Sequence, residues 1–454
     1  MASALDQQNV GADVAAFGDP HIVTMRPHLV AAAQSLIAAR SPKDFYELQE
    51  MLLGMFAARQ QVAAERRTRI KAERAHLSAM VRRRPKPSGE LLAEQQRTIA
   101  ILEHQDRRDQ LLQHVVRVLA DGMAWRLLNC DRRTITIYGN EQRVGRLAPE
   151  DGFRAERAEA RQLWDEAGTL ALHNDLTNCL RSGDLTVLCD WPPRSVIFRE
   201  VKADGRDRKD SAQARRLEQK HRLSSTGLGE FDSGGPRVQV RRLSVAYRTY
   251  LYELPELLET ANRVGYAQGF PSDYLGVAAI DYRRVNETAA DPDDLAKRVA
   301  RARGWIPESD RCFGTSASIT RLRERHHAIA YFAPISIFPL GAEAVIDLLL
   351  GQTDYVAWLS VDALKPFFDA RSITVEFASG RDVGHTFLTA SRGGVDVTVP
   401  ATLRNQMLRE LMTAGTLVDI VDEMLLEAEA GLAFAPSSMS FPDESEAWPA
   451  AQVL

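Results

Sequence analysis

An acid and a base stand two residues apart where an apolar stretch of the sequence ends, in SVIFREVK (195–202). Alternate residues of a strand point to the same face, so Glu200 and Lys202 project together while Val201 points into the core. Two charges on one face of a buried strand cost several kcal/mol unless something compensates them. Either the strand reaches the surface here, where the two form a solvated ion pair, or the charges serve a chemical function.

A second acid is predicted to join this pair. Asp184, which follows a glycine, opens the strand-like segment 184–189. The next residues, DWPPR, are a turn signal that lets this segment pair antiparallel with the strand carrying Glu200 and Lys202. In such a hairpin the beginning of the first strand lies opposite the end of the second. The sequence therefore predicts that Asp184 lies close to Glu200 and Lys202.

Two carboxylates and an ammonium at one strand end suit metal-assisted hydrolysis of a phosphodiester. The carboxylates supply hard oxygen ligands for Mg²⁺ or Mn²⁺. Such a metal polarises the phosphate and lowers the pKa of a bound water, and a lysine can position that water or offset developing charge. The three residues thus indicate a nuclease that requires a divalent cation.

This arrangement, G-D followed by a hairpin and by E-x-K in an apolar strand, resembles the PD-(D/E)xK nuclease superfamily, which has the restriction-endonuclease-like fold. The resemblance covers roughly residues 118–250. It implies a central mixed β-sheet flanked by helices, divalent-metal catalysis, and cleavage of DNA more often than RNA. By position, Asp184 and Glu200 would hold the metal and Lys202 would be the catalytic lysine. No proline precedes Asp184, at a position that varies in the superfamily.

The resemblance also implies roles for residues on the two neighbouring helices. Members often add an acid from the preceding helix, for which Glu166 is the best-placed metal ligand and Glu159 a second candidate. Many carry a glutamine or basic residue on the following helix, where Gln213, Arg216 and Lys220 fall on one face. Gln213 would be catalytic, and the two basic residues would bind nucleic acid. For Glu166 and Gln213 the alternative is an exposed polar side chain on a helix.

Two other functions compete with the nuclease. The chain could be a catalytically inert nuclease-fold module that only binds nucleic acid. It could also be an adaptor built on its N-terminal helices, in which Glu200 and Lys202 form a structural pair. The presence of all three central residues favours an enzyme. A nuclease joined to a further domain suggests bacterial defence against foreign DNA, or DNA repair, which is an inference from analogy of fold.

At 454 residues the chain is long enough for two or three domains. The pattern predicts a multidomain α/β protein. Its expected parts are a flexible segment 1–43, a helical hairpin or arm 44–117, the nuclease domain 118–250, a C-terminal α/β or α+β domain of unknown role 251–435, and an acidic flexible tail 436–454. The C-terminal domain would select a target, a protein partner or a trigger.

Apolar periodicity and turn signals place the individual elements after the hairpin. Helices are expected at about 153–167, 210–222, 253–267, 291–305 and 402–430. Strands are expected at about 134–138, 176–180, 184–189, 195–203, 237–247, 274–282, 328–338 and 372–378.

The predicted hairpin carries a strongly basic run. Between Arg59 and Lys86 there are ten basic residues and two acids. Arg82, Arg83 and Arg84 are candidate contacts for phosphate backbones, and the alternative is a solvated helix face. Two aspartates, Asp106 and Asp109, occupy would-be core positions of the second helix, which favours a hairpin over a long coiled coil. The hairpin is also a candidate surface for a homodimer.

Composition narrows the class of protein further. The hydrophobic content of 45% and charged content of 26% are typical of globular proteins. The four cysteines form no C-x-x-C pair, which fits a reducing compartment and argues against a zinc ribbon or a disulfide scaffold. The most apolar run is broken by prolines and acids, so it is expected in a core and not in a membrane. A cytoplasmic protein is the expectation.

Overall fold

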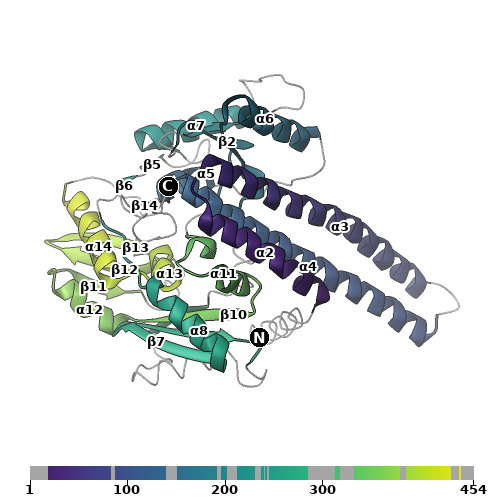
Figure 1. Cartoon of the computed structure of the whole chain (residues 1–454). Helices are drawn as coiled ribbons and strands as arrows, with labels where there is room; N and C mark the ends of the chain where they lie inside the picture. Colours follow the sequence, from purple (N-terminus) through teal and green to yellow (C-terminus); the bar gives the residue numbers. More distant parts are fainter. Residues whose placement is uncertain are drawn as a thin grey trace.

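The fold is described from a computed structural model of the chain. It describes residues 19–82, 87–139, 151–191, 196–201, 212–230, 237–239, 241–242, 245–284, 312–316, 332–378, 385–430 and 439–440. The described part is a mixed α/β protein in which a long helical hairpin projects from a body of helices and small sheets (Figure 1). No helix in these ranges is long and apolar enough to cross a membrane.

Three N-terminal helices form the projecting part of the molecule (Figure 1). As predicted, α3 (Pro42–Arg82) and α4 (Gly89–Leu127) are the two arms of a hairpin, and α2 (Pro20–Ala38) packs against both. An Asp19 carboxylate oxygen accepts a hydrogen bond of 2.8 Å from a backbone N–H of the first turn and caps α2. The flexible segment predicted over 1–43 is therefore wrong from residue 20 onwards, because a capped helix with a buried apolar face begins there.

The middle of the chain contains a three-stranded antiparallel sheet in the order β1-β2-β3. Its elements are α6 (Asp151–Ala167), β1 (Ala171–His173), β2 (Leu185–Leu188), β3 (Val196–Arg199) and α7 (Ala212–Thr226). These confirm both predicted helices and the predicted hairpin to within a few residues. Among the described residues no parallel strand joins this sheet, so the mixed sheet that the resemblance implies is not confirmed.

The first of two wrong predictions in this region concerns residues 134–138. They were expected as a strand and instead belong to α5 (Arg132–Gly139). The Asp131 carboxylate accepts hydrogen bonds from Arg133 N at 3.1 Å and from Thr134 Oγ1 at 2.7 Å. This cap starts a helix in a sequence whose β-branched and aromatic residues favour a strand.

The second wrong prediction is the strand at 176–180. That segment follows a single 3₁₀ turn, η1 (Asn174–Leu176), and has no strand pairing. The buried Asp121 carboxylate accepts hydrogen bonds from the backbone N–H groups of Asn178 and Cys179, at 2.6 and 2.9 Å. A side chain of α4 therefore takes the donors that a strand would have used.

Four short strands follow α7: β4 (Leu228–Glu230) pairs with β5 (Arg237–Gln239), and β6 (Arg241–Arg242) pairs in parallel with β14 (Met439–Ser440). Of the strand predicted over 237–247, residues 237–239 and 241–242 lie in strands, and the described residues 245–247 do not. The predicted flexible tail 436–454 is wrong at residues 439–440, because this piece is part of a sheet.

The residues after 250 form a second α/β unit, as predicted, around two antiparallel sheets in the orders β7-β8-β10-β9 and β11-β12-β13. Its elements are η2 (Leu251–Glu253), α8 (Leu254–Val264), β7 (Tyr266–Ser272), β8 (Leu275–Asp281), β9 (Cys312–Ser316), η4 (Ile335–Ile337), α11 (Ala342–Leu349), β10 (Thr353–Ser360), α12 (Val361–Asp369), β11 (Thr374–Phe377), β12 (Thr386–Arg392), β13 (Val395–Pro400), α13 (Ala401–Arg409) and α14 (Ala414–Glu429). The helix expected at 291–305 lies outside the described residues.

Two expectations for this unit are wrong. The described part of the strand predicted at 328–338 contains the short 3₁₀ helix η4 and no strand. The single long helix predicted at 402–430 is divided into α13 and α14. Leu411 between them has a φ of +50°, outside the helical region, and Thr413 then caps α14 through a hydrogen bond of 3.2 Å from Thr416 N.

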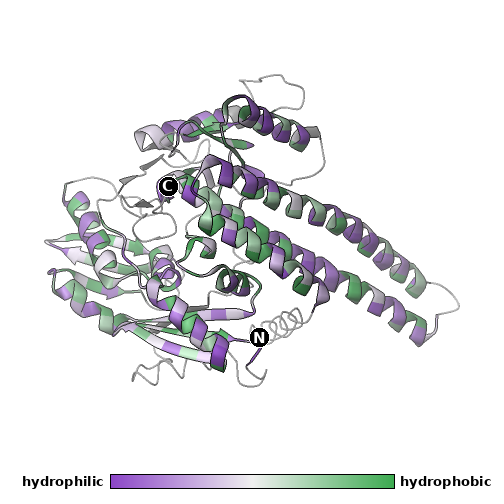
Figure 2. Cartoon of the chain, in the orientation of Figure 1, coloured by the Kyte–Doolittle hydropathy of each residue, from purple (hydrophilic) through white to green (hydrophobic). Residues whose placement is uncertain are grey.

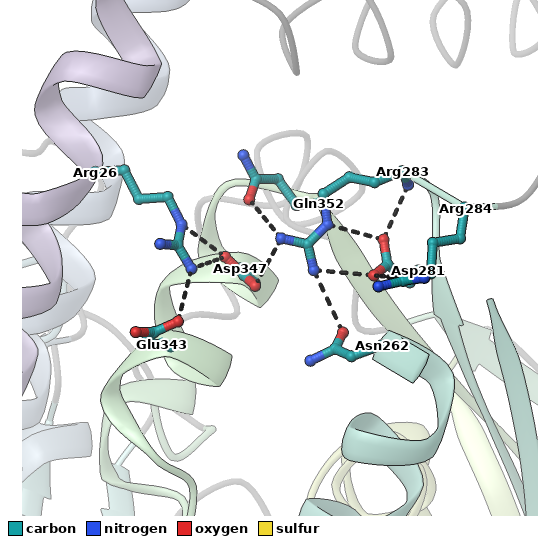
Figure 3. A network of polar contacts seen from close by, with 8 residues as sticks. All are labelled: Arg26, Asn262, Asp281, Arg283, Arg284, Glu343, Asp347 and Gln352. Carbon is teal, nitrogen blue, oxygen red and sulfur yellow. Dashed lines mark hydrogen bonds and ion pairs between the residues drawn. The ribbon is translucent and has the colours of Figure 1, made fainter. Parts of the chain in front are cut away.

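A charged network joins α2 to the C-terminal unit (Figure 3). Asp347 of α11 lies between two arginines, with Arg26 Nη2 at 2.8 Å from Oδ1 and Arg283 Nη1 at 3.0 Å from Oδ2. Arg283 also pairs with Asp281, at the end of β8. Asp347 and Asp281 are both almost fully buried, and Asp347 is the acid whose partners come from distant parts of the chain.

A second network joins the start of α5 to the end of α13. The Arg132 guanidinium donates to both carboxylate oxygens of Glu410, at 3.0 and 2.6 Å. Glu410 also accepts from Ala333 N at 2.8 Å and from the Tyr247 hydroxyl. Most of the buried apolar side chains likewise belong to one large cluster, which extends from α2 to α14, and two smaller clusters lie apart from it. Hydrophilic residues cover much of the projecting part of α3 (Figure 2).

Candidate functional site

The β2–β3 hairpin brings Asp184 to the end of β3. Leu185 pairs with Arg199 in the strand register, and Asp184 N donates to the Arg199 carbonyl at 2.7 Å. The Asp184 Oδ2 atom accepts a hydrogen bond of 2.6 Å from Val201 N. The carboxylate therefore lies against the backbone next to Glu200, as the hairpin predicts. Lys202 lies outside the described residues.

Gly183 allows this close approach. Its φ is +73°, and a Cβ atom at this position would lie 2.9 Å from the Arg199 carbonyl oxygen. An L-residue would be strained by the backbone angle and would also clash with the neighbouring strand. The glycine before Asp184 is thus needed for the hairpin to close around the acid.

Two apolar residues at this end of the hairpin, Phe198 of β3 and Val201 just after it, pack against different helices. Phe198 stacks on Tyr138 of α5 with ring centroids 3.5 Å apart. Val201 packs on the opposite side, against a small buried cluster that includes Ala160 of α6. The predicted inward direction of Val201 is therefore confirmed.

Glu156 of α6 is the acid most affected by this arrangement. Its side chain is 8% exposed, and Oε2 meets no hydrogen-bond partner among the described residues. Burial is the largest cause that raises the pKa of Glu156 to about 8. The negative charges of Asp184, Asp175 and Glu200 raise this pKa further.

Asp175, in η1, is the fourth member of the group. Burial raises the pKa of Asp175, the cationic Arg117 of α4 opposes that rise, and Asp184 adds to it. We call Glu156, Asp175, Asp184 and Glu200 the acidic cluster. Its members come from α6, from η1, from the loop before β2 and from the residues just after β3, so it depends on the packing of α6 and η1 against the hairpin.

Sequence reasoning missed two of these four acids. The signal for Glu156 was available, since Phe153, Glu156, Ala160 and Leu163 follow the spacing of one helix face. Three of them are apolar and pack inwards. No comparable signal existed for Asp175, which lies in a turn.

The acids predicted on the preceding helix are not brought to the cluster. Glu166 is exposed near the C-terminal end of α6, where Oε1 accepts a hydrogen bond of 2.8 Å from Gln162. It lies ten residues after Glu156, about 15 Å along the helix axis. Glu159 forms an ion pair of 3.0 Å with Arg199. Glu156 takes the position that the prediction gave to Glu166.

The predicted nucleic-acid contacts divide into three groups. Arg216 of α7 and Arg82 at the end of α3 are exposed, while Arg83 and Arg84 lie outside the described residues. Lys220 is 1% exposed, and its Nζ atom donates to Ser182 Oγ at 2.5 Å. The prediction that Lys220 contacts a nucleic acid at the surface is therefore wrong. Gln213 lies within α7, and its side chain is not described.

Much of the basic run in α3 is neutralised inside the hairpin. Arg66 pairs with Asp109, Arg67 Nε lies 3.0 Å from Asp106, and Arg74 Nη2 lies 2.6 Å from Glu103. These pairs explain the acids at would-be core positions of α4. They give this part of the run a structural role, which differs from both predictions, phosphate contacts and a solvated helix face.

A divalent cation needs several oxygen ligands at one point. In the described ranges no group of three or more His, Cys, Asp or Glu side chains is placed to hold a metal ion. The acidic cluster supplies ligands of the right chemistry, and Glu156 Oε2 is available for one. Comparison of the chain with protein-family models, curated proteins and solved structures gave no match.

Proposed function

We propose that this chain is a divalent-metal-dependent nuclease of the restriction-endonuclease-like fold that hydrolyses phosphodiester bonds in DNA. One observation carries the proposal. At the end of the β2–β3 hairpin the Asp184 carboxylate lies beside Glu200, and both acids raise the pKa of the buried Glu156. Negative charge gathered at a partly buried place favours the binding of a cation there.

Asp184, Glu200 and Glu156 are the residues that would hold Mg²⁺ or Mn²⁺. When bound, the ion would polarise the scissile phosphate and lower the pKa of a bound water. Lys202 is assigned the role of positioning that water or offsetting developing charge, and Gln213 a supporting catalytic role. Glu156 replaces Glu166 as the acid from the preceding helix.

The surface that meets the nucleic acid is assigned to α7, where Arg216 is exposed. Arginine binds phosphate oxygens through several N–H donors. The C-terminal unit would select a target, partner or trigger. This organisation fits an enzyme of bacterial defence or DNA repair.

A second candidate, an inert nuclease-fold module that binds nucleic acid, is favoured by one observation. Three carboxylates placed to share an ion are not found among the described residues. A module of this kind would keep the exposed arginine of α7 and lack a working metal site. The two candidates differ in whether DNA is cut after it binds.

Cleavage of supercoiled plasmid, linear duplex, single-stranded DNA and RNA, with Mg²⁺ or Mn²⁺, tests the proposal. We expect Glu200→Gln and Lys202→Met each to lower the cleavage rate by about 100-fold or more. Glu166→Gln is the matched control, because it removes a charge from the same region outside the cluster, and it should cleave like the unchanged protein.

DNA binding by fluorescence anisotropy separates the remaining outcomes. Cleavage that is undiminished in both Glu200→Gln and Lys202→Met would show that the site lies elsewhere. Binding without cleavage, under every metal condition, would favour the inert module. Absence of both cleavage and binding would contradict both candidates.

A further inference from the structure

A small cavity lies where α4, the residues before η4, and α13 meet. Trp125 and Asp121 of α4 line it, together with Phe332 and with Arg409 of α13. Its volume of about 20 Å³ accommodates a guest the size of one water molecule or one monatomic ion. None of the four carboxyl groups of the acidic cluster lines this cavity, so it is a separate place in the molecule.

Two N–H donors of residues that line the cavity have no acceptor in the described part of the chain. Trp125 is 0% exposed, and its Nε1–H group has no hydrogen-bond partner among the described residues. The Nε–H group of Arg409 is shielded from water and is likewise without a partner in the described part of the chain. Buried donors are nearly always satisfied by protein, water or a ligand, so two at one cavity point to a guest that accepts hydrogen bonds.

The charge at the cavity is unbalanced. Burial lowers the pKa of Arg409, yet a guanidinium remains protonated in proteins. It lies over the Phe332 ring, 4.9 Å from the centroid, and no carboxylate of the described residues is within ion-pair distance of it. The neighbouring Glu410 already pairs with Arg132. Among the described residues, Arg409 therefore contributes a positive charge without a carboxylate counter-ion.

Asp121 also lines the cavity, but its charge is directed elsewhere. Its two carboxylate oxygens accept hydrogen bonds from Asn178 N, Asn178 Nδ2 and Cys179 N, at 2.6, 2.8 and 2.9 Å. These three N–H donors partly compensate the negative charge of the carboxylate. An acceptor between Arg409 and Trp125 is thus opposed only weakly by this acid.

We propose that the cavity binds one small monovalent anion of the size of chloride, held by the Arg409 guanidinium and the Trp125 indole N–H. The anion supplies the missing counter-ion and accepts from both donors. Because Trp125 belongs to α4 and Arg409 to α13, the bound anion bridges the N-terminal helices and the C-terminal unit. Its binding would therefore raise the free energy of unfolding of the whole chain.

Thermal unfolding of the full chain tests whether the cavity binds chloride. Chloride replaces gluconate at constant ionic strength, because gluconate is too large for the cavity. We expect a saturable rise in Tm of about 1–3 °C. Arg409→Met keeps a long side chain over Phe332 and should remove the response. Arg404→Met, on the same helix, is the matched control and should retain it. Trp125→Phe should raise the chloride concentration at half-saturation by about tenfold, because it removes one hydrogen bond to a charged group.

The chloride NMR line width provides a measurement that does not depend on stability. The unchanged protein and Arg404→Met should broaden the line, and Arg409→Met should not. A Tm independent of chloride, together with no broadening, would show that water fills the cavity and would overturn the proposal. A response that survives in Arg409→Met would place the anion elsewhere and would overturn it equally.

Discussion

Glu156 meets two conditions that oppose ionisation, burial and neighbouring negative charge. Its pKa is about 8 in the folded protein, against an ordinary value of 4.5. The folded state therefore holds a proton that the unfolded chain releases between these pH values. The contribution of this bound proton to the free energy of unfolding is complete below pH 4.5 and is lost as the pH rises through 8.

Replacing Glu156 by glutamine should remove this loss. At pH 8.5 we expect the free energy of unfolding of Glu156→Gln to exceed that of the unchanged protein by roughly 2–4 kcal/mol, with little difference at pH 4.5. Urea denaturation at the two pH values measures it. Glu159→Gln, which alters an exposed ion pair on the same helix, should change stability by less than about 1 kcal/mol. An identical pH dependence in both variants would contradict the assignment.

His173 of β1 has the opposite dependence on pH. It is fully buried, and burial lowers its pKa to about 4, from an ordinary value of 6.5. Its contribution to stability is present above pH 6.5 and is lost as the pH falls through 4. We expect the unchanged protein to lose about 2–3 kcal/mol between pH 6.5 and 4.5 through this residue, and His173→Leu to lose correspondingly less. Denaturant midpoints across that range measure the difference, with the exposed His28→Gln as a control that should follow the unchanged protein.

At this scale the sequence predicted two of the four clustered acids. The period of a strand and the DWPPR turn were sufficient to bring Asp184 to Glu200. Glu156 was missed, although the spacing of a helix face carried a signal for it, and its position became visible only once α6 was placed on the sheet. Asp175 was not predictable, because its position depends on where η1 lies relative to Arg117 and Asp184.

The elements themselves were predicted best where the apolar residues repeat regularly over many positions. The two arms of the hairpin, α6, α7 and the β2–β3 pair follow from repeating apolar positions. The failures at α5 and at 176–180 have one physical cause. In each case an aspartate, Asp131 or Asp121, binds backbone N–H groups and fixes a conformation that side-chain propensity does not indicate.

Gly183 tests how the hairpin depends on its first residue. Gly183→Ala should destabilise the protein by about 1–3 kcal/mol, because φ is positive and the new Cβ would lie against the Arg199 carbonyl. Gly54→Ala is the matched control. It lies in α3 with open space around it, and should be neutral or stabilising by up to about 1 kcal/mol.

Hydrogen exchange locates this effect. Exchange of the Val201 amide should become faster in Gly183→Ala, because that N–H donates to Asp184. If Val201 exchange were unchanged while stability fell, the strain would be confined to the turn, and the proposed link between Gly183 and the position of Asp184 would fail.

At the scale of the whole molecule, length suggested separate domains, whereas the described parts share one apolar core and two buried ionic connections. These long-range pairs join residues hundreds of positions apart. No local pattern in the sequence indicates which arginine meets which acid. The coarse α/β class could therefore be predicted, and the joining of its parts could not.

A substitution of Glu410 tests how much the ionic connection between α5 and α13 contributes to stability. Glu410→Gln leaves Arg132 buried without its counter-ion, so we expect a loss of about 3–5 kcal/mol in the free energy of unfolding. Asp419→Asn, in an exposed pair with Arg371, should cost less than about 1 kcal/mol. Circular dichroism and tryptophan fluorescence should report one coincident transition in the unchanged protein. Two separated transitions would show that the parts unfold independently.

The parallel pair of β6 and β14 has a consequence for biosynthesis. Arg241–Arg242 leaves the ribosome long before Met439–Ser440, and the latter strand also packs against α5. Folding during translation can therefore assemble the helical hairpin early, but β6 acquires its parallel partner only after residues 439–440 have been made. A truncated nascent chain would lack this strand.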